Sequence, residues 1–448
     1  MPKHRLGAFV ALAVMVIAGA LVSVPAVLST GAAALPPPAP INGGDTAWMI
    51  VATAMVLLMT PGLAFFYGGM VSKQHVIGTM FQSFIAMGVV SLLWVVVGFS
   101  LSFGTSIHGL IGDPRTFFMF RDVGLTTNAA LAPTIPLALF ALFQMKFAII
   151  TPALVTGSFA ERIKFSSFIW FMILFTLFVY APLAHWTWHP DGFLHKWGVL
   201  DFAGGTVVHM AAGFAGLAGA LAVSHGPKKG ATANLGHTPQ VPANIPFVLL
   251  GTGLLWFGWF GFNAGSELAV DGGAVSAFLT TNTAAAAAMV AWLLTDLLMG
   301  RKVTALNAAI GAVVGLVAVT PAAGFVNVGA SIAIGTVAAL VSNLMLNAQW
   351  LKARIPDTLD VFACHGVGGI VGMILTAVFA LKGGLITGDA TLLLKHLAAA
   401  VLVAVYTFGV SALLYRVVGF IGSLSTSNVL SRDGAAFDLD LGDMEGIL

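Results

Sequence analysis

The chain consists of long apolar stretches separated by shorter polar ones. Eleven stretches have about the length that a helix needs to cross the hydrocarbon core of a bilayer. The connections between them are predicted to be short, so the pattern predicts one compact, all-α bundle in a membrane. The eleven predicted transmembrane helices are 47–70, 77–103, 133–156, 165–184, 200–224, 245–266, 274–299, 304–321, 328–350, 360–381 and 394–420.

The N-terminal stretch differs from these eleven. Residues 1–34 begin with the basic sequence MPKHR, continue with the apolar run LGAFVALAVMVIAGALVSV and end in small residues before a proline-rich break. This order is typical of a secretory signal peptide, with cleavage near Ala34. The alternative is a retained additional helix. With cleavage, residues 35–424 form the membrane domain and residues 425–448 form a tail.

Composition indicates the same environment. The 448 residues are 58% apolar and only 8% charged, against about a quarter charged in soluble domains. The net charge of +2 is too small and too scattered to favour nucleic acid as a partner. Cys364 is the single cysteine, which excludes an internal disulfide and a cysteine-based metal cluster. No cofactor is predicted.

The distribution of lysine and arginine predicts the orientation, because cytoplasmic loops carry an excess of these residues. One alternate set of connections is poor in them, with Arg115, Arg121, Lys196 and Lys382. The richer set is therefore predicted to be cytoplasmic, which places the mature N-terminus outside and the tail inside. The richer set contains Lys73, Arg162, Lys164, Lys228, Lys229, Arg301, Lys302, Lys352 and Arg354.

The chain also repeats itself weakly. Three short motifs of the first five predicted helices recur in the same order in the next five. Because five is odd, the second copy would cross the membrane in the opposite direction, which is the inverted-repeat architecture of many transporters, and the eleventh helix is left over. The pairs are GLAFFYGG (62–69) with GWFGFNAG (258–265), AIITPALVTG (148–157) with LVAVTPAAGF (316–325), and DFAGGTVVHMAAG (201–213) with DVFACHGVGG (360–369).

Two histidines lie at matching positions of this repeat. His209 and His365 each follow an aspartate, Asp201 and Asp360 respectively. Ionisable groups inside a membrane are costly, and by default they mark a functional site. The repeat predicts that the two imidazoles meet near the midplane, where one can donate a hydrogen bond and the other can accept it. The alternatives are two unrelated histidines bonded to backbone carbonyls, and a purely capping role for Asp201.

Paired histidines would also suit a metal site or an intramembrane enzyme. Zinc usually takes about four ligands, and the sequence shows no third ligand at matching depth. Cys364 adjoins His365, but neighbouring residues on a helix point about 100° apart. An enzyme would need a nucleophile or a metal together with a cavity open to water, and the sequence indicates neither.

Aromatic residues gather at the predicted outer ends of the helices. The usual interpretation is an interfacial belt. The apolar surroundings and the nearby Ser266 favour a second interpretation, in which the ring faces attract a small cation beside a hydroxyl acceptor. The aromatic residues are Phe143, Phe147, Trp188, Trp259 and Phe262.

Six motifs together resemble the ammonium transporter family, which also contains the Rhesus-type proteins. The resemblance covers about residues 45–420. It implies a homotrimer of eleven-helix protomers in a bacterial inner membrane, each with a narrow apolar pore for ammonium or ammonia, and methylammonium as a second candidate substrate. The motifs are PGLAFFYGG, FQMKFAIITPAL, AERIKFSS, DFAGGTVVH, GWFGFNAGS and DVFACHGVGGIVG.

The resemblance also implies roles for individual residues. Trp188 and Ser266 together resemble the bacterial and plant branch, so a Rhesus-like conduit for ammonia or carbon dioxide is the alternative, and an ammonium sensor is another. The implied sites are outer recruitment by Phe147, Trp188 and Ser266; gate rings at Phe147 and Phe262; pore histidines His209 and His365; a pore wall of Trp259, Tyr67 and Phe66; and Asp201 below the outer vestibule.

Three features depart from the family pattern. Lys146 is adjacent to the gate residue Phe147, where relatives usually carry a neutral residue, and we expect its side chain to face away from the vestibule. An outer loop carries His185, His189 and His195, which we interpret as solvated rather than metal-binding. The tail lacks the usual acidic ending, which weakens the expectation of a cytosolic nitrogen-signalling partner.

Overall fold

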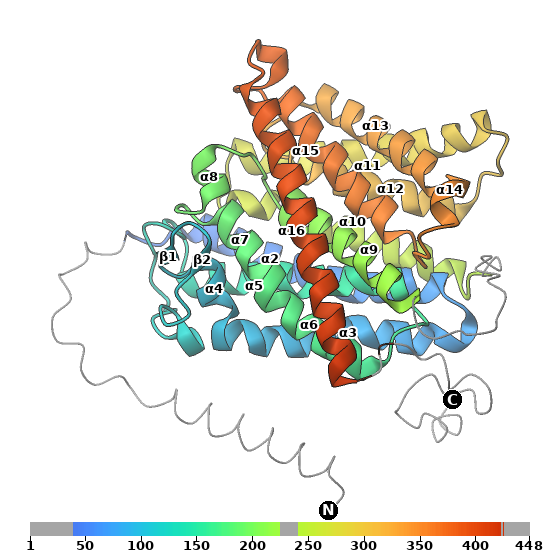
Figure 1. Ribbon diagram of the computed structural model, residues 1–448. Coiled ribbons are helices and arrows are strands. Elements are labelled where there is room, and N and C mark those ends of the chain that lie inside the picture. The colour runs from blue at the N-terminus through green and yellow to red at the C-terminus, as the bar shows by residue number, and fades with distance from the viewer. Residues whose placement is uncertain (1–38, 225–240, 423, 425–448) are drawn as a thin grey trace, which may run out of the picture.

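The computed structural model describes residues 39–224, 241–422 and 424, and these form a bundle of helices (Figure 1). Ten of the described helical spans are long and apolar enough to cross a membrane, and α12 (Ala305–Val319) is a shorter apolar helix. Together they correspond to the eleven predicted stretches. The predicted signal peptide, residues 1–34, and the predicted tail, residues 425–448, lie outside the described residues.

The helices follow one another in two halves and a final segment. The first half contains α2 (Gly43–Met70), α3 (Val76–Leu93), α4 (Phe99–Phe103), α5 (Leu137–Val155), α6 (Phe165–Phe175), α7 (Ala181–Trp188), α8 (Phe193–Trp197) and α9 (Ala211–Ser224). The second half contains α10 (Ile245–Ala264), α11 (Gly272–Leu298), α12, α13 (Val328–Leu346), α14 (Gln349–Lys352) and α15 (Gly368–Phe379), and α16 (Thr391–Ile421) follows.

Shorter helical turns join or interrupt these helices. Four are π-helical: η2 (Trp94–Gly98), η5 (Thr176–Tyr180), η6 (Gly205–Met210) and η8 (Phe362–Val367). The others are 3₁₀ turns: η1 (Lys73–His75), η3 (Phe118–Phe120), η4 (Thr156–Phe159), η7 (Gly265–Glu267) and η9 (Leu385–Thr387).

Polar side chains cap the starts of several membrane helices. Asn42, Asn244, Asp271, Thr304 and Asn327 each accept hydrogen bonds from backbone N–H groups in the first turn of α2, α10, α11, α12 and α13. These N–H groups have no partner within their own helix, so a side-chain acceptor stabilises each start by about 1 kcal/mol. The caps explain why apolar stretches without sharp internal breaks begin at defined residues.

The two halves pack with reciprocal contacts. α2 lies along α10, α9 contacts η8, and α15 contacts η6. At the crossing of the last two pairs, a Cβ atom on Gly213 would meet the backbone of Gly366, and one on Gly369 would meet Met210. Gly213 lies four residues after His209, and Gly369 lies four residues after His365. Their contact partners, Gly366 and Met210, each lie one residue after a histidine, His365 and His209 respectively. This reciprocity is what a pseudo-two-fold axis relating inverted repeats produces.

One connection is longer than the sequence pattern predicts. Residues 104–136, between α4 and α5, contain the antiparallel hairpin of β1 (Ser106–Ile107) and β2 (Ile111–Gly112), as well as η3. Hydrogen bonds from Arg115 lower the pKa of the half-buried Asp113 carboxyl to about 2. The prediction that every connection is short is therefore wrong here, because turn and cap chemistry orders this segment without an apolar periodicity.

The last helix, α16, runs across both halves (Figure 1). The Tyr406 hydroxyl donates to the carbonyl oxygen of Phe178 at 2.6 Å. The Tyr415 ring stacks on Phe171, with centroids 4.1 Å apart and an interplanar angle of 8°. The helix left over from the predicted repeat is therefore packed against the bundle rather than peripheral to it.

Candidate functional site

Both candidate pore histidines lie in π-helical turns. His209 is in η6, directly before α9, and His365 is in η8, directly before α15. A π turn has one more residue per turn than an α-helix and is frequent at functional sites, because it redirects side chains within an otherwise regular helix. Gly204 precedes η6 with φ of 115°, a conformation that glycine adopts far more readily than other residues.

The aspartate before each π turn caps it. The Asp201 carboxylate accepts from the backbone N–H groups of Gly204 (2.8 Å), Gly205 (2.6 Å) and Thr206 (2.7 Å), and from the Thr206 hydroxyl (2.5 Å). The capping interpretation of Asp201 is confirmed. The carboxylate is buried, and its oxygens accept these four hydrogen bonds. It therefore stabilises the start of the segment that carries His209.

In the second half the capping residue is Asp357 and not Asp360. The Asp357 carboxylate accepts from the backbone N–H of Phe362 at 2.7 Å, five residues further on, as Asp201 does from Thr206. Asp357 also lies eight residues before its histidine, as Asp201 does. Asp360 instead occupies a left-handed backbone conformation with φ of 57°. The short motif pairing of Asp201 with Asp360 is therefore wrong by three residues.

The two histidines face each other, as the repeat predicts. Their Nδ1 atoms are 3.3 Å apart and their ring centroids 5.4 Å apart, with an interplanar angle of 25°. Both side chains are buried. The alternative of two unrelated histidines bonded to backbone carbonyls does not describe this pair.

The hydroxyl of Thr320 orients the pair, and sequence reasoning missed it. Thr320 Oγ donates to the carbonyl of Leu316 (2.8 Å), accepts from the indole N–H of Trp259 (2.9 Å) and lies 3.3 Å from Nε2 of His209. A hydroxyl has one hydrogen, so this network assigns the hydrogen between Thr320 and His209 to Nε2. His209 Nδ1 then accepts from His365 Nδ1–H. The only signal for Thr320 was its place in the motif LVAVTPAAGF.

Aromatic rings cover one side of this pair. The Phe147 and Phe262 rings lie 4.1 Å apart at 32°, and the Trp188 ring meets Phe147 edge-on at 5.7 Å. Phe262 and Trp259 are within 6.1 and 5.3 Å of the His209 ring, both measured between centroids. The rings therefore continue directly into the histidine pair, and the structure brings together Phe147, Trp188, Phe262 and Trp259 of the predicted recruitment, gate and wall residues.

Ser266 lies in η7, directly after the helix that carries Phe262. Its hydroxyl donates to the carbonyl oxygen of Phe262 at 2.8 Å, and the residue is partly exposed. Because a hydroxyl oxygen keeps two lone pairs when its hydrogen is used, Ser266 can still accept a hydrogen bond from a visiting N–H group.

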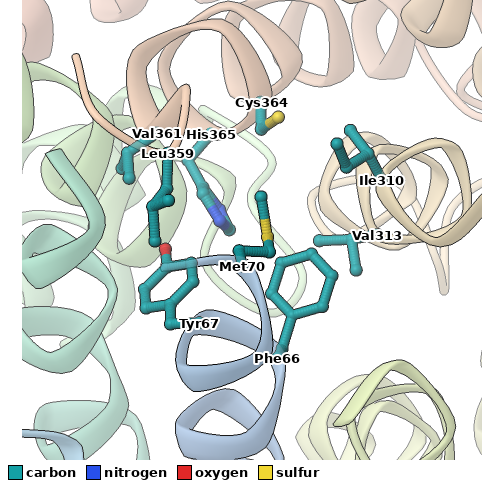
Figure 2. A pocket seen from close by; sticks show the side chains of 9 residues that line it. All are labelled: Phe66, Tyr67, Met70, Ile310, Val313, Leu359, Val361, Cys364 and His365. Carbon is teal, nitrogen blue, oxygen red and sulfur yellow. The ribbon is translucent and has the colours of Figure 1, made fainter. Parts of the chain in front are cut away.

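A narrow, mostly apolar cavity lies beside His365 (Figure 2). Phe66 and Tyr67 line it from α2, and the Tyr67 hydroxyl is held by a 3.0 Å hydrogen bond to the carbonyl of Leu154. Phe66 corresponds to Phe262 in the pairing of GLAFFYGG with GWFGFNAG. Each histidine therefore has a repeat-related phenylalanine on its own side.

Comparison with known proteins identifies the family. The model of the Ammonium Transporter Family matches residues 47–435. The chain belongs to the ammonium transporter family. It is 48% identical to a putative ammonium transporter of Methanothermobacter thermautotrophicus over 84% of this chain and 91% of that protein. Its membership and its apolar helices identify it as a multi-pass membrane protein with a transport function rather than an enzyme.

Solved structures have the same fold. The crystal structure of Saccharomyces cerevisiae Mep2 superposes with a TM-score of 0.80, at 32% identity, over 89% of this chain and 91% of that chain. A structure titled Sensor Amt Protein superposes with a TM-score of 0.78, at 30% identity, over 87% of this chain and 98% of that one. Because a protein titled a sensor shares this fold, the fold by itself does not distinguish a transporter from a sensor.

The Lys146 side chain is buried in α5. Its Nζ lies 3.8 Å from Sδ of Met145, and no described carboxylate lies within ion-pair distance of it. Lys146 and Phe147 are neighbours on a helix and so project about 100° apart, while Phe147 contacts Trp188 and Phe262. This geometry is consistent with the expectation that Lys146 faces away from the vestibule.

The three histidines His185, His189 and His195 do not form one cluster. His185 and His189 stack with centroids 4.4 Å apart, and both are buried rather than solvated as predicted, whereas His195 is exposed. The ring nitrogens of His185 face the Ser102 carbonyl and the Ser106 hydroxyl. Among the described residues there is no group of three or more His, Cys, Asp and Glu side chains placed to hold a metal ion.

Proposed function

We propose that this protein imports ammonium by recruiting the cation outside, removing a proton and conducting neutral ammonia through an apolar pore. The proton travels separately along the imidazoles, so that transport carries current. The single observation that supports this proposal best is the continuous buried series of the Phe147 and Phe262 rings, His209 and His365. Methylammonium is a second candidate substrate.

Magnitudes favour ammonia over the ion in the pore. Moving a bare monovalent ion into a low-dielectric lumen costs on the order of 20 kcal/mol by an idealised Born estimate. A cation–π contact offsets about 0.5–2 kcal/mol, so three rings cannot compensate. Potassium has nearly the same size and charge as ammonium but cannot lose a proton. Deprotonation therefore distinguishes ammonium from potassium, which the size of a cavity would not do.

Each group has a defined part in the proposal. Phe147, Trp188 and the Ser266 hydroxyl attract the cation and accept its N–H groups outside the gate. Phe147 and Phe262 separate this site from the pore, and His209 and His365 exchange hydrogen bonds with ammonia inside it. Asp201 acts through the segment that it caps, and through its negative charge below the vestibule.

Assembly and location are part of the same proposal. We infer a homotrimer in the bacterial inner membrane, with the N-terminus outside and the C-terminus in the cytoplasm. The richness of alternate connections in lysine and arginine supports this orientation. A cytosolic nitrogen-signalling protein is a candidate partner. A sensor with the same binding site is the second candidate function, favoured by the similarity to the structure titled Sensor Amt Protein.

Purified protein in liposomes on a solid-supported membrane tests the function. An ammonium pulse is expected to produce a transient current, and a potassium pulse of the same concentration is expected to produce none. A potassium current, or no ammonium current from folded protein, contradicts the proposal. A protein that binds ammonium without transporting it would support the sensor.

The substitution His209→Ala tests the pore histidine. It removes the partner of His365 and the hydrogen bond toward Thr320, so selective ammonium current is expected to be lost. The measurement is the ratio of ammonium to potassium current in the same liposomes. Unchanged ammonium current with potassium still excluded would show that the imidazole is dispensable.

A further inference from the structure

Another buried histidine, outside the pore, forms hydrogen bonds to two segments that carry candidate pore residues. His396 of α16 is fully buried, with Nδ1 2.7 Å from the carbonyl oxygen of Met373 and Nε2 2.9 Å from the backbone nitrogen of Leu200. A carbonyl can only accept and a backbone N–H can only donate. Nδ1 therefore carries the ring hydrogen, and Nε2 accepts from Leu200, which requires a neutral imidazole.

The two partners belong to different halves of the repeat. Leu200 directly precedes Asp201, whose carboxylate caps η6 and whose carbonyl oxygen accepts from the Trp188 indole N–H at 3.2 Å. Met373 lies in α15, the helix that continues from the turn carrying His365. The His396 ring thus connects the backbone beside the outer site to the helix of the second pore histidine.

We propose that His396 is a positioning residue for the outer mouth of the pore. By holding the Leu200 N–H and the Met373 carbonyl, it sets where the segment of Asp201 and Trp188 lies relative to the second half. It touches neither substrate nor the pore histidines, and it acts through the backbone of Leu200. The inference rests on the proposed function for its effect on ammonium and on hydrogen bonding alone for its structural part.

Three substitutions separate this role from simple packing. His396→Leu removes both hydrogen bonds. His396→Gln retains them in principle, because the amide nitrogen can donate to Met373 and the amide oxygen can accept from Leu200. Thr407→Val is the matched control on the same helix, because Thr407 is buried and its hydroxyl has no hydrogen-bond partner among the described residues.

The first readout is hydrogen–deuterium exchange of the peptide that contains Leu200, in the full-length protein. A backbone N–H without its buried acceptor opens more easily, so H396L is expected to exchange at Leu200 roughly tenfold faster. H396Q and T407V are expected to match the wild type. Unchanged protection of Leu200 in H396L overturns the inference, whether or not the protein transports ammonium.

The second readout is the ammonium concentration that gives half-maximal current in liposomes. H396L is expected to raise it roughly tenfold, since a displaced Trp188 and Asp201 weaken recruitment, while H396Q and T407V stay within about twofold of the wild type. If H396L does not fold, H396Q serves as the test. A folded H396Q in which Leu200 exchanges faster, or which needs more ammonium for half-maximal current, overturns the inference. Wild-type protein without any ammonium current would contradict the proposed function. The structural role of His396 would then be tested by the hydrogen–deuterium exchange of Leu200 alone.

Discussion

At the scale of single residues, one hydroxyl orients the paired histidines His209 and His365. The Thr320 hydroxyl has a single hydrogen and donates it to the Leu316 carbonyl oxygen, which can only accept. The indole N–H of Trp259 can only donate to Thr320, so the remaining lone pair faces Nε2 of His209. The direction of hydrogen bonding in the histidine pair therefore depends on the hydroxyl of Thr320.

Thr320→Val tests this dependence. Valine has nearly the shape of threonine but leaves two buried N–H donors without an acceptor, which costs about 1–3 kcal/mol of unfolding free energy. Ammonium current is expected to fall about tenfold, because His209 loses the acceptor that orients it and a barrier higher by about 1.4 kcal/mol slows transport by a factor of ten. Thr320→Ser keeps the hydroxyl and is expected to retain current. Equal currents for the valine and serine variants would remove Thr320 from the pore network.

At the scale of elements, the histidines meet because two helices cross without side chains between them. Gly213 of α9 lies against the backbone of Gly366 in η8, so a Cβ at position 213 has no room. The capped starts of η6 and η8 then bring His209 and His365 within hydrogen-bond distance. Close approach through small residues is the usual way in which membrane helices pack.

Gly213→Ala is expected to separate this crossing. The methyl group must push α9 away from η8, and such overpacking typically costs about 1–3 kcal/mol. Thermal unfolding in detergent is expected to shift downward, and ammonium current is expected to decrease with it. Gly253→Ala is the control, since nothing lies within 4 Å of a Cβ built there. Similar losses for both variants would point to a general effect of replacing glycine in a membrane helix.

At the scale of the whole molecule, α16 fastens the two halves together. Tyr415 stacks on Phe171 at one end, and His396 bonds both halves at the other. The helix therefore has a structural role that its position outside the repeat does not reveal. Its burial depends on ring packing and not on the Tyr415 hydroxyl, which has no hydrogen-bond partner among the described residues.

Tyr415→Ala is expected to destabilise the folded protein by about 3 kcal/mol or more, because it removes a fully buried ring and leaves a cavity. Tyr415→Phe keeps the ring and is expected to be neutral or slightly stabilising, because it removes an unpaired buried hydroxyl. The thermal unfolding midpoint of each variant in detergent measures both effects. A phenylalanine variant as unstable as the alanine variant would mean that the hydroxyl has a partner after all.

The sequence by itself determined the number of membrane helices and most of the site. Apolar length against bilayer thickness is a local property, so eleven stretches could be read directly from the chain. The weak repeat placed His209 opposite His365, and the resemblance to the family implied that Phe147 lies beside Trp188 and Phe262. These predictions survived because each depends on residue type and order along the chain.

Only the tertiary structure decided the finer register. Three features have no periodic signature in the sequence. They are the π turns at both histidines, the capping of the second turn by Asp357 instead of Asp360, and the position of Thr320 between Trp259 and His209. A π turn shifts every following side chain by one residue, and a hydrogen bond between helices depends on their relative register. Local patterns record which faces are buried, whereas the pairing of donors with acceptors appears only once the helices are packed.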